Sequence, residues 1–224
     1  MSVAQPTQAQ LPEAPPNCPI CPRLVAFRAT NRAAHPNWFN GAVPSFGGDT
    51  ARLLIVGLAP GLKGANRTGR PFLGDYAGEL LYRTLLKVGL AQGSHDPARP
   101  EALTLVDCMI TNAVRCVPPA NKPTPSEITH CRQFLEARIA ALPKLRVILA
   151  LGRIAHESTL DAWGLKRRDY PFAHGARVEL ATGQVLFDSY QCSRQNTNTG
   201  RLTTPMFEAV LRCIADELKL GKRS

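Results

Sequence analysis

The chain has 224 residues, which suits one compact globular domain, and its composition excludes collagen-like, coiled-coil and wholly disordered proteins. Its 27 Lys and Arg exceed its 17 Asp and Glu, and the net charge of +10 favours a polyanionic partner such as nucleic acid. Solubilising surface charge is the alternative explanation. No apolar run approaches the roughly 18 residues of a membrane-spanning helix, so we expect no membrane contact.

The first 17 residues differ in composition from the rest of the chain. They are rich in Gln, Pro and Ala, and they contain neither the basic start nor the apolar core of a secretion signal. We therefore predict a flexible N-terminal arm over residues 1–17, a single domain over residues 18–224 and a cytoplasmic protein. In such a protein the seven cysteines favour a metal, a cluster or free thiols over disulfide bonds.

Strand and helix patterns alternate along the remaining sequence. Apolar runs and one hairpin signal predict strands over residues 52–60, 104–112, 146–151, 178–180 and 185–190. Periodic patterns with capping signals predict helices over residues 22–34, 75–89, 124–142 and 153–163 and from about residue 205 onward. This order predicts an α/β fold, a three-layer sandwich with a mainly parallel central sheet and helices on both faces.

Three polar loops each follow a predicted strand. They cover residues 57–75, 111–123 and 190–201. Because α/β folds place their sites at the carboxyl ends of parallel strands, we expect these loops to build one site.

Together these loops resemble the uracil-DNA glycosylase superfamily, and specifically family 5, the B-type enzymes that carry an iron-sulfur cluster. The resemblance runs from Cys18 to about Leu218. Its most specific pieces are the Gly57-Leu-Ala-Pro-Gly loop with the following Gly64 to Phe72, the strand end Thr111-Asn112 leading to Cys116, and Ser193-Arg-Gln-Asn followed by Thr199 to Thr203.

The resemblance implies a DNA repair enzyme. It would hydrolyse the N-glycosidic bond of uracil in DNA and leave an abasic site, with hypoxanthine, ethenocytosine and other damaged bases as further candidate substrates. It implies a monofunctional enzyme, since no lysine stands at a matched catalytic position. The expected partner is double-stranded DNA, with single-stranded DNA as a second candidate, and the expected protein is a monomer.

Four cysteines form a candidate metal site. Cys18 and Cys21 make a C-x-x-C pair, and Cys116 and Cys131 follow downstream. Four thiolates suit a tetrahedral zinc or a cubane cluster, and spacing alone does not choose between them. By itself Cys131 also fits the apolar stripe of its helix. The family resemblance implies that these four residues bind a [4Fe-4S] cluster, which would hold distant segments together.

Asp75 is the candidate catalytic carboxylate. On sequence alone it also suits the N-cap of the helix that follows. The resemblance implies that Asp75 orients or activates the attacking water, and the neighbouring Leu58 and Ala59 cannot act as a base. A nearby anion would also stabilise the oxocarbenium-like sugar of glycosidic cleavage.

The resemblance places the base pocket at a second group of residues. Phe72 would stack on an extrahelical base and the Asn112 amide would bond to its edge, while Gly57, Ala59 and Gly61 would let the backbone approach closely. Core packing for Phe72 and a strand-end turn for Asn112 are the alternatives.

The last loop departs from the family pattern. Gln191 stands where the family has a histidine that donates a hydrogen bond to the departing base, so Gln191 is the second candidate catalytic residue and full activity is in question. The DNA contacts that the resemblance suggests are Asn66, Arg67, Arg70, Ser193, Arg194, Gln195, Asn196 and Arg201.

Two other functions remain open at this point. One is a weakly active or inactive DNA-damage binding protein, which Gln191 favours. The other is a zinc-stabilised nucleic-acid adaptor without an enzyme's pocket.

Overall fold

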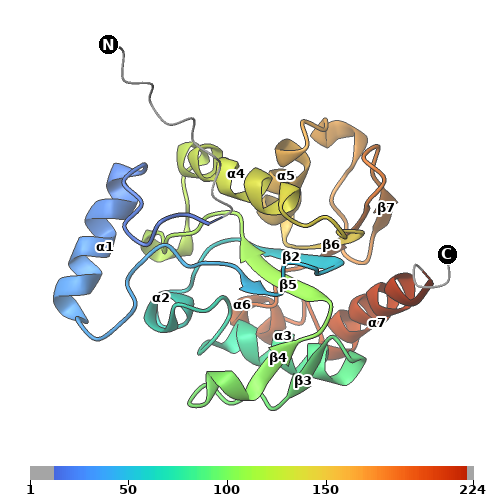
Figure 1. Cartoon of the computed structure of the whole chain (residues 1–224), viewed down its shortest axis with the longest axis horizontal. Coiled ribbons are helices and arrows are strands. Elements are labelled where there is room, and N and C mark those ends of the chain that lie inside the picture. The colour runs from blue at the N-terminus through green and yellow to red at the C-terminus, as the bar shows by residue number, and fades with distance from the viewer. Residues whose placement is uncertain (1–12, 221–224) are drawn as a thin grey trace, which may run out of the picture.

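A six-stranded sheet forms the centre of the molecule in the computed structural model, which describes residues 13–220 (Figure 1). The strand order is β1-β5-β2-β6-β8-β7. The strands are β1 (Phe46–Gly47), β2 (Leu53–Gly57), β5 (Cys108–Asn112), β6 (Val147–Leu151), β7 (Arg177–Glu179) and β8 (Val185–Ser189). Neighbours among β5, β2, β6 and β8 run parallel, and the edge strands β1 and β7 run antiparallel to the strands beside them.

Helices cover both faces of the sheet. The helices are α1 (Pro22–Ala34), α2 (Ala65–Thr68), α3 (Tyr76–Val88), α4 (Pro125–Ala140), α5 (Arg153–Ala162), α6 (Arg194–Asn198) and α7 (Thr204–Leu220). Side chains of α3 and α7 pack on one face and those of α4 and α5 on the other, as the layers in Figure 1 show. The predicted three-layer α/β sandwich is therefore confirmed.

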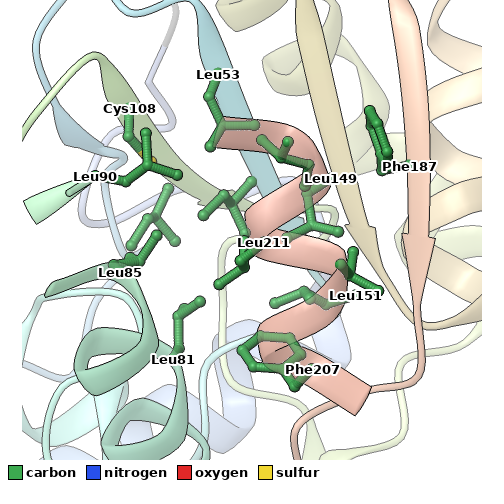
Figure 2. Close-up of a cluster of buried hydrophobic side chains, with 14 of the residues drawn as sticks. Leu53, Leu81, Leu85, Leu90, Cys108, Leu149, Leu151, Phe187, Phe207 and Leu211 are labelled. Carbon is green, nitrogen blue, oxygen red and sulfur yellow. The ribbon is translucent and has the colours of Figure 1, made fainter. Parts of the chain in front are cut away.

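The central strands supply side chains to both layers of the core because successive strand residues point to opposite faces. In β2, Leu53 and Ile55 belong to the cluster under α3 and α7, whereas Leu54 and Val56 belong to the cluster under α4 and α5. Figure 2 shows Phe207 and Leu211 of α7 pointing into the first of these clusters. Burial on both faces explains why these strands read as continuous apolar runs.

The segment predicted as one strand over residues 104–112 is two strands in the structure. β4 (Leu103–Leu105) pairs with β3 (Ala91–Gly93) in a separate ribbon, and only β5 joins the sheet. The chain turns between them at Asp107, whose φ is 57° and whose carboxylate accepts a hydrogen bond from Arg52 Nε at 2.7 Å. A left-handed residue cannot continue a strand, and Asp tolerates that conformation better than most.

Most of the predicted N-terminal arm, residues 1–12, lies outside the part of the chain that the structure describes. Residues 13–17 pack on the domain. Glu13 accepts hydrogen bonds from the guanidinium groups of Arg115 at 2.8 Å and Arg138 at 3.0 Å, and both arginines are buried. Among residues 13–220, no helix combines the length and apolar character that crossing a bilayer requires.

Candidate active site

A cleft of about 540 Å³ opens at the carboxyl edge of the sheet. The loops after β2, β5 and β8 and the first turn of α3 form its walls, as expected for a parallel sheet. Among the residues singled out from the sequence, those that line it are Ala59, Gly61, Phe72, Asp75, Asn112, Gln191, Ser193, Arg194 and Gln195.

Asp75 is both a helix cap and a wall of the cleft. Its Oδ1 accepts a hydrogen bond from the Gly78 amide at 2.9 Å, which caps α3. Its Oδ2 lies over the glycine-rich loop, where a Cβ at Gly61 would be 3.0 Å away and one at Gly64 only 2.5 Å away. The two glycines therefore make room for the carboxylate.

Burial raises the pKa of Asp75 above its usual value, and hydrogen bonds from the Gly78 and Ala77 amides offset part of this rise. A carboxylate with a raised pKa is a stronger base than a solvent-exposed one. The arrangement can therefore hold an ionised group that accepts a proton from a water in the cleft.

Phe72 and Asn112 meet above the last residue of β2. Gly57 pairs with Asn112 in the register of β2 and β5, and a Cβ at Gly57 would lie 2.4 Å from Asn112 Oδ1 and 2.6 Å from Phe72 Cζ. Gly57 thus lies beneath both side chains, and any larger residue would displace them. Phe72 holds a φ of 60°, which costs a bulky residue energy and shows that its surroundings fix it in place.

The Asn112 carboxamide has an unsatisfied atom. Asn112 is buried, and its Oδ1 has no hydrogen-bond partner among residues 13–220. Such an orphaned acceptor costs roughly 1–3 kcal/mol. A bound molecule that donates a hydrogen bond beside the Phe72 ring would remove this cost.

Gln191 stands where the cleft meets a neighbouring pocket of about 370 Å³. Its backbone oxygen accepts a hydrogen bond from Asn196 Nδ2 at 2.8 Å, and Ser193 caps α6 by accepting one from the Asn196 amide. Asn196 therefore holds the loop that carries Gln191. Arg201 lines the neighbouring pocket, with its guanidinium 4.6 Å from the centre of the Tyr190 ring.

The four candidate cysteine ligands surround one apolar pocket beside the loop that follows β5. Cys18, Cys116 and Cys131 are buried and Cys21 is half-buried. Two N–H groups point at the sulfurs: Arg28 Nη1 lies 3.6 Å from Cys116 Sγ, and the Arg115 amide lies 3.2 Å from Cys131 Sγ. Such donors stabilise thiolates.

Burial raises the pKa of Cys116 to about 11 and that of Cys131 to about 12, so both thiols are protonated at neutral pH unless a metal displaces the proton. Within residues 13–220, no three His, Cys, Asp or Glu side chains converge closely enough to hold a single metal ion. The four cysteines line one pocket without converging on a single point, and four thiols are a donor set that suits either a zinc ion or an iron-sulfur cluster.

Residues 44–215 match the sequence profile of the "Uracil DNA glycosylase superfamily". The chain belongs to the uracil DNA glycosylase superfamily. A "Type-5 uracil-DNA glycosylase" of Thermus thermophilus is 47% identical over 205 residues, covering 87% of this chain and 90% of the relative. Type-5 enzymes of Pyrobaculum aerophilum (37%, 88% of this chain and 87% of the relative) and Mycobacterium bovis (40%, 87% and 76%) are also similar.

These relatives confirm the resemblance to family 5 and, with it, the expected class of enzyme, a hydrolase acting on N-glycosyl bonds. A "Type-4 uracil-DNA glycosylase" of Pyrobaculum aerophilum is more distant, at 34% identity over 66% of this chain and 62% of the relative.

In this glycosylase-family chain, three residues suggested as DNA contacts line neither the cleft nor the pocket beside it. Arg70 is part-buried, donates to the backbone oxygens of Pro100 and Leu103 and has Phe46 beneath its guanidinium, so it anchors the β3–β4 ribbon. Asn66 is fully buried and donates to Asn40 Oδ1 at 2.9 Å. These bonds hold Arg70 and Asn66 away from the cleft, and the DNA contacts expected of both residues remain predictions. Arg67 is exposed, but its Nε donates to Lys63 O within its own turn.

The structure also adds residues to the cleft of this family-5 chain. Tyr76 lines it directly after Asp75, and its position next to the candidate carboxylate was the signal that could have revealed it. Ala120 and Asn121 line the opposite side with φ values of 54° and 55°. Asparagine often adopts this left-handed conformation but alanine rarely does, so the sequence gives no signal for it at Ala120.

Proposed function

We propose that the protein is a monofunctional glycosylase that removes uracil from DNA by hydrolysing the N-glycosidic bond. The observation that carries the proposal is the meeting, in one cleft, of the Asp75 carboxylate, the Phe72 ring and the unpartnered Oδ1 of Asn112. Hypoxanthine, ethenocytosine and other deaminated or oxidised bases are further candidate substrates.

With its Oδ1 turned toward N3 of the base, Asn112 favours uracil over cytosine. Uracil offers an N3–H donor beside its O4 acceptor, which matches the Oδ1 acceptor and Nδ2 donor of a carboxamide. Cytosine offers the reverse order, an N3 acceptor beside an amino donor. Phe72 supplies a flat surface for the base once it has left the duplex, a step that costs a few kcal/mol and is cheapest at a mispaired base.

Asp75 acts on the sugar and the attacking water, and Gln191 acts on the departing base. As the C–N bond breaks, positive charge builds on the sugar and negative charge on the base. Asp75 stabilises the first and takes a proton from the attacking water. The Gln191 amide donates a hydrogen bond to the departing base, and loss of such a donor typically costs about 10²- to 10³-fold in rate. An amide is a neutral donor, so we expect slower release than a histidine at this position would give.

No step needs a lysine. Lys122 lies on the rim of the cleft, but it is exposed, whereas lysines that form Schiff bases are usually desolvated. Attack by water leaves an abasic site with the strand intact.

DNA is held by charge at the rim. Arg194 and Lys122 line the mouth, Gln195 adds an amide, and the surplus of +10 attracts the phosphate backbone. We expect a monomer acting on double-stranded DNA, with single-stranded DNA as a second candidate, in the cytoplasm.

We also assign a [4Fe-4S] cluster to Cys18, Cys21, Cys116 and Cys131. When bound it would act as a cross-link and not as a redox catalyst. It would join the N-terminal segment to the loop after β5 and to α4, and the N–H groups on two of the sulfurs support thiolate ligation. Visible absorption with bound iron and sulfide would support it, since zinc thiolates are colourless.

A strand-breakage assay tests the activity. Duplexes carrying uracil, hypoxanthine, ethenocytosine or only normal bases are incubated with the protein. Strand breakage is then measured in samples with and without alkali treatment. Breakage only after alkali, and only in the damaged duplexes, is the expected result. Tight binding without release of any base would instead favour a DNA-damage binding protein, the alternative that Gln191 suggests.

A further inference from the structure

Tyr76 holds an exposed aromatic ring at the mouth of the cleft. Its side chain is 41% exposed, and among residues 13–220 only Phe39 is a comparably exposed Phe, Tyr or Trp. As the first residue of α3, Tyr76 follows Asp75 directly, so the cap that fixes the carboxylate also fixes the backbone that carries the ring. An exposed ring in such a fixed place suggests that it contacts a ligand.

The ring divides two depressions of the surface. One is the cleft that holds Asp75, and the other is a groove of about 460 Å³ between α3 and α7. The charges along that groove are paired, Lys87 with Glu208 and Arg83 with Glu79. The groove therefore offers no surplus of positive charge for a phosphate, and the flat ring at its border suits an uncharged base.

Arg194, the first residue of α6, extends across the mouth of the cleft toward Tyr76. Its guanidinium carbon is 5.3 Å from the centre of the Tyr76 ring, within the range of a cation–π contact. The pair joins the loop after β8 to the start of α3. The contact orients the ring from one side and leaves it accessible from the cleft.

We propose that Tyr76 stacks on the base of a nucleotide that adjoins the target nucleotide on the same DNA strand, with Arg194 holding the ring. This inference rests on the proposed function, because it requires a target nucleotide in the cleft. The neighbouring nucleotide is joined to the target by one phosphate, so its base must pass close to the rim. Stacking on an aromatic side chain suits every base and therefore restricts sequence little.

The test is a double-mutant cycle on DNA binding, in which the Tyr76 ring and the neighbouring base are removed separately and together. Binding is measured for DNA with a tetrahydrofuran abasic analogue at the target position, with the base on its 5′ or its 3′ side either present or removed. For the wild type, removal on one of the two sides should weaken binding about tenfold, the scale of one base–aromatic stack. Tyr76→Ala should weaken binding equally, and base removal should then have no further effect.

Two variants serve as controls. Tyr76→Phe keeps the ring and should show the wild-type response, whereas Phe39→Ala removes a ring of similar exposure that does not line the cleft and should leave the response unchanged. Thermal unfolding checks that Tyr76→Ala is folded, which its exposed position favours.

The outcomes separate the two proposals. If uracil is released but the losses from Tyr76→Ala and from base removal multiply, the stacking role is wrong and the proposed function stands. If neither the wild type nor Gln191→His releases uracil or prefers abasic to intact DNA, the proposed function fails and the stacking role fails with it.

Discussion

His156 Nδ1 lies 2.8 Å from Asp188 Oδ1, and both side chains are buried between α5 and β8. The other ring nitrogen, Nε2, lies 2.8 Å from the Tyr170 carbonyl oxygen, which can only accept a hydrogen bond. Burial opposes a charge on this ring, but the hydrogen bonds to Asp188 and Tyr170 outweigh it and raise the pKa of His156.

The raised pKa of His156 predicts a stability that depends on pH. The unfolded chain has an ordinary histidine pKa of about 6.5. The contribution of the pair is therefore complete below about pH 6.5 and is lost as the pH rises through the higher pKa of the folded state. Chemical unfolding of the wild type and of His156→Gln should give a difference in stability that shrinks as the pH rises above about 6.5. A difference that stays constant over this range would contradict the assignment.

Asp75 allows its two roles to be separated by two substitutions. Asn caps a helix about as well as Asp, so Asp75→Asn should unfold at nearly the wild-type temperature but lose about 10²- to 10⁴-fold in single-turnover base release. Asp75→Ala should lose that activity and also about 0.5–2 kcal/mol of stability. Full activity in Asp75→Asn would show that the carboxylate acts only as a cap.

Gln191 sets the expected rate of the reaction. Gln191→His should raise the single-turnover rate, and Gln191→Ala should lower it because no donor remains for the departing base. Quenched-flow measurement at saturating protein isolates this step from product release. Equal rates in all three proteins would place the donor elsewhere and count against the assigned pocket.

The cysteine quartet predicts a loss of solubility and colour on substitution. Cys18→Ala should reduce soluble yield and remove any visible absorption, since one ligand of the assigned cluster is lost. Cys213→Ala is the matched control, because Cys213 is exposed on α7 and lines no pocket with the quartet. The same loss in both variants would argue against a specific metal group.

The salt dependence of DNA binding distinguishes rim arginines from structural ones. The logarithm of the binding constant should fall with the logarithm of salt concentration by about 0.9 per phosphate contact. Arg194→Ala should reduce this slope by about one unit if its guanidinium meets a phosphate. Arg70→Ala should leave the slope unchanged and lower the unfolding temperature, because Arg70 anchors the β3–β4 ribbon. A flat salt response in the wild type would contradict DNA binding by this surface.

The sequence predicted the layers well because burial on two faces leaves continuous apolar runs and helix ends leave capping residues. It could not show that Asp107 breaks one of those runs, since the side chain that holds the Asp107 carboxylate, Arg52, lies 55 positions away. The backbone partners of Arg70 were hidden for the same reason. Its partners Pro100 and Leu103 lie 30 and 33 positions further along the chain. From the sequence alone, an arginine in a polar loop that binds a phosphate cannot be distinguished from one that binds backbone oxygens.

In the site, the sequence named the residues that converge in the cleft but not the geometry that relates them. The dual position of Asp75 and the unpartnered Oδ1 of Asn112 follow from packing against Gly57, Gly61 and Gly64. The position of Tyr76 beside Asp75 was visible in the sequence, but its contact with Arg194 was not, because that contact joins segments far apart in the chain.

Glu13 has a practical consequence for where a shortened form of the protein could begin. Its carboxylate supplies the counter-charge for two buried guanidinium groups, one of them next to Cys116 in sequence. A proteolytic fragment or alternative start at Cys18 would keep the whole cysteine quartet yet remove this counter-charge. We expect such a fragment to be less stable than one that retains Glu13.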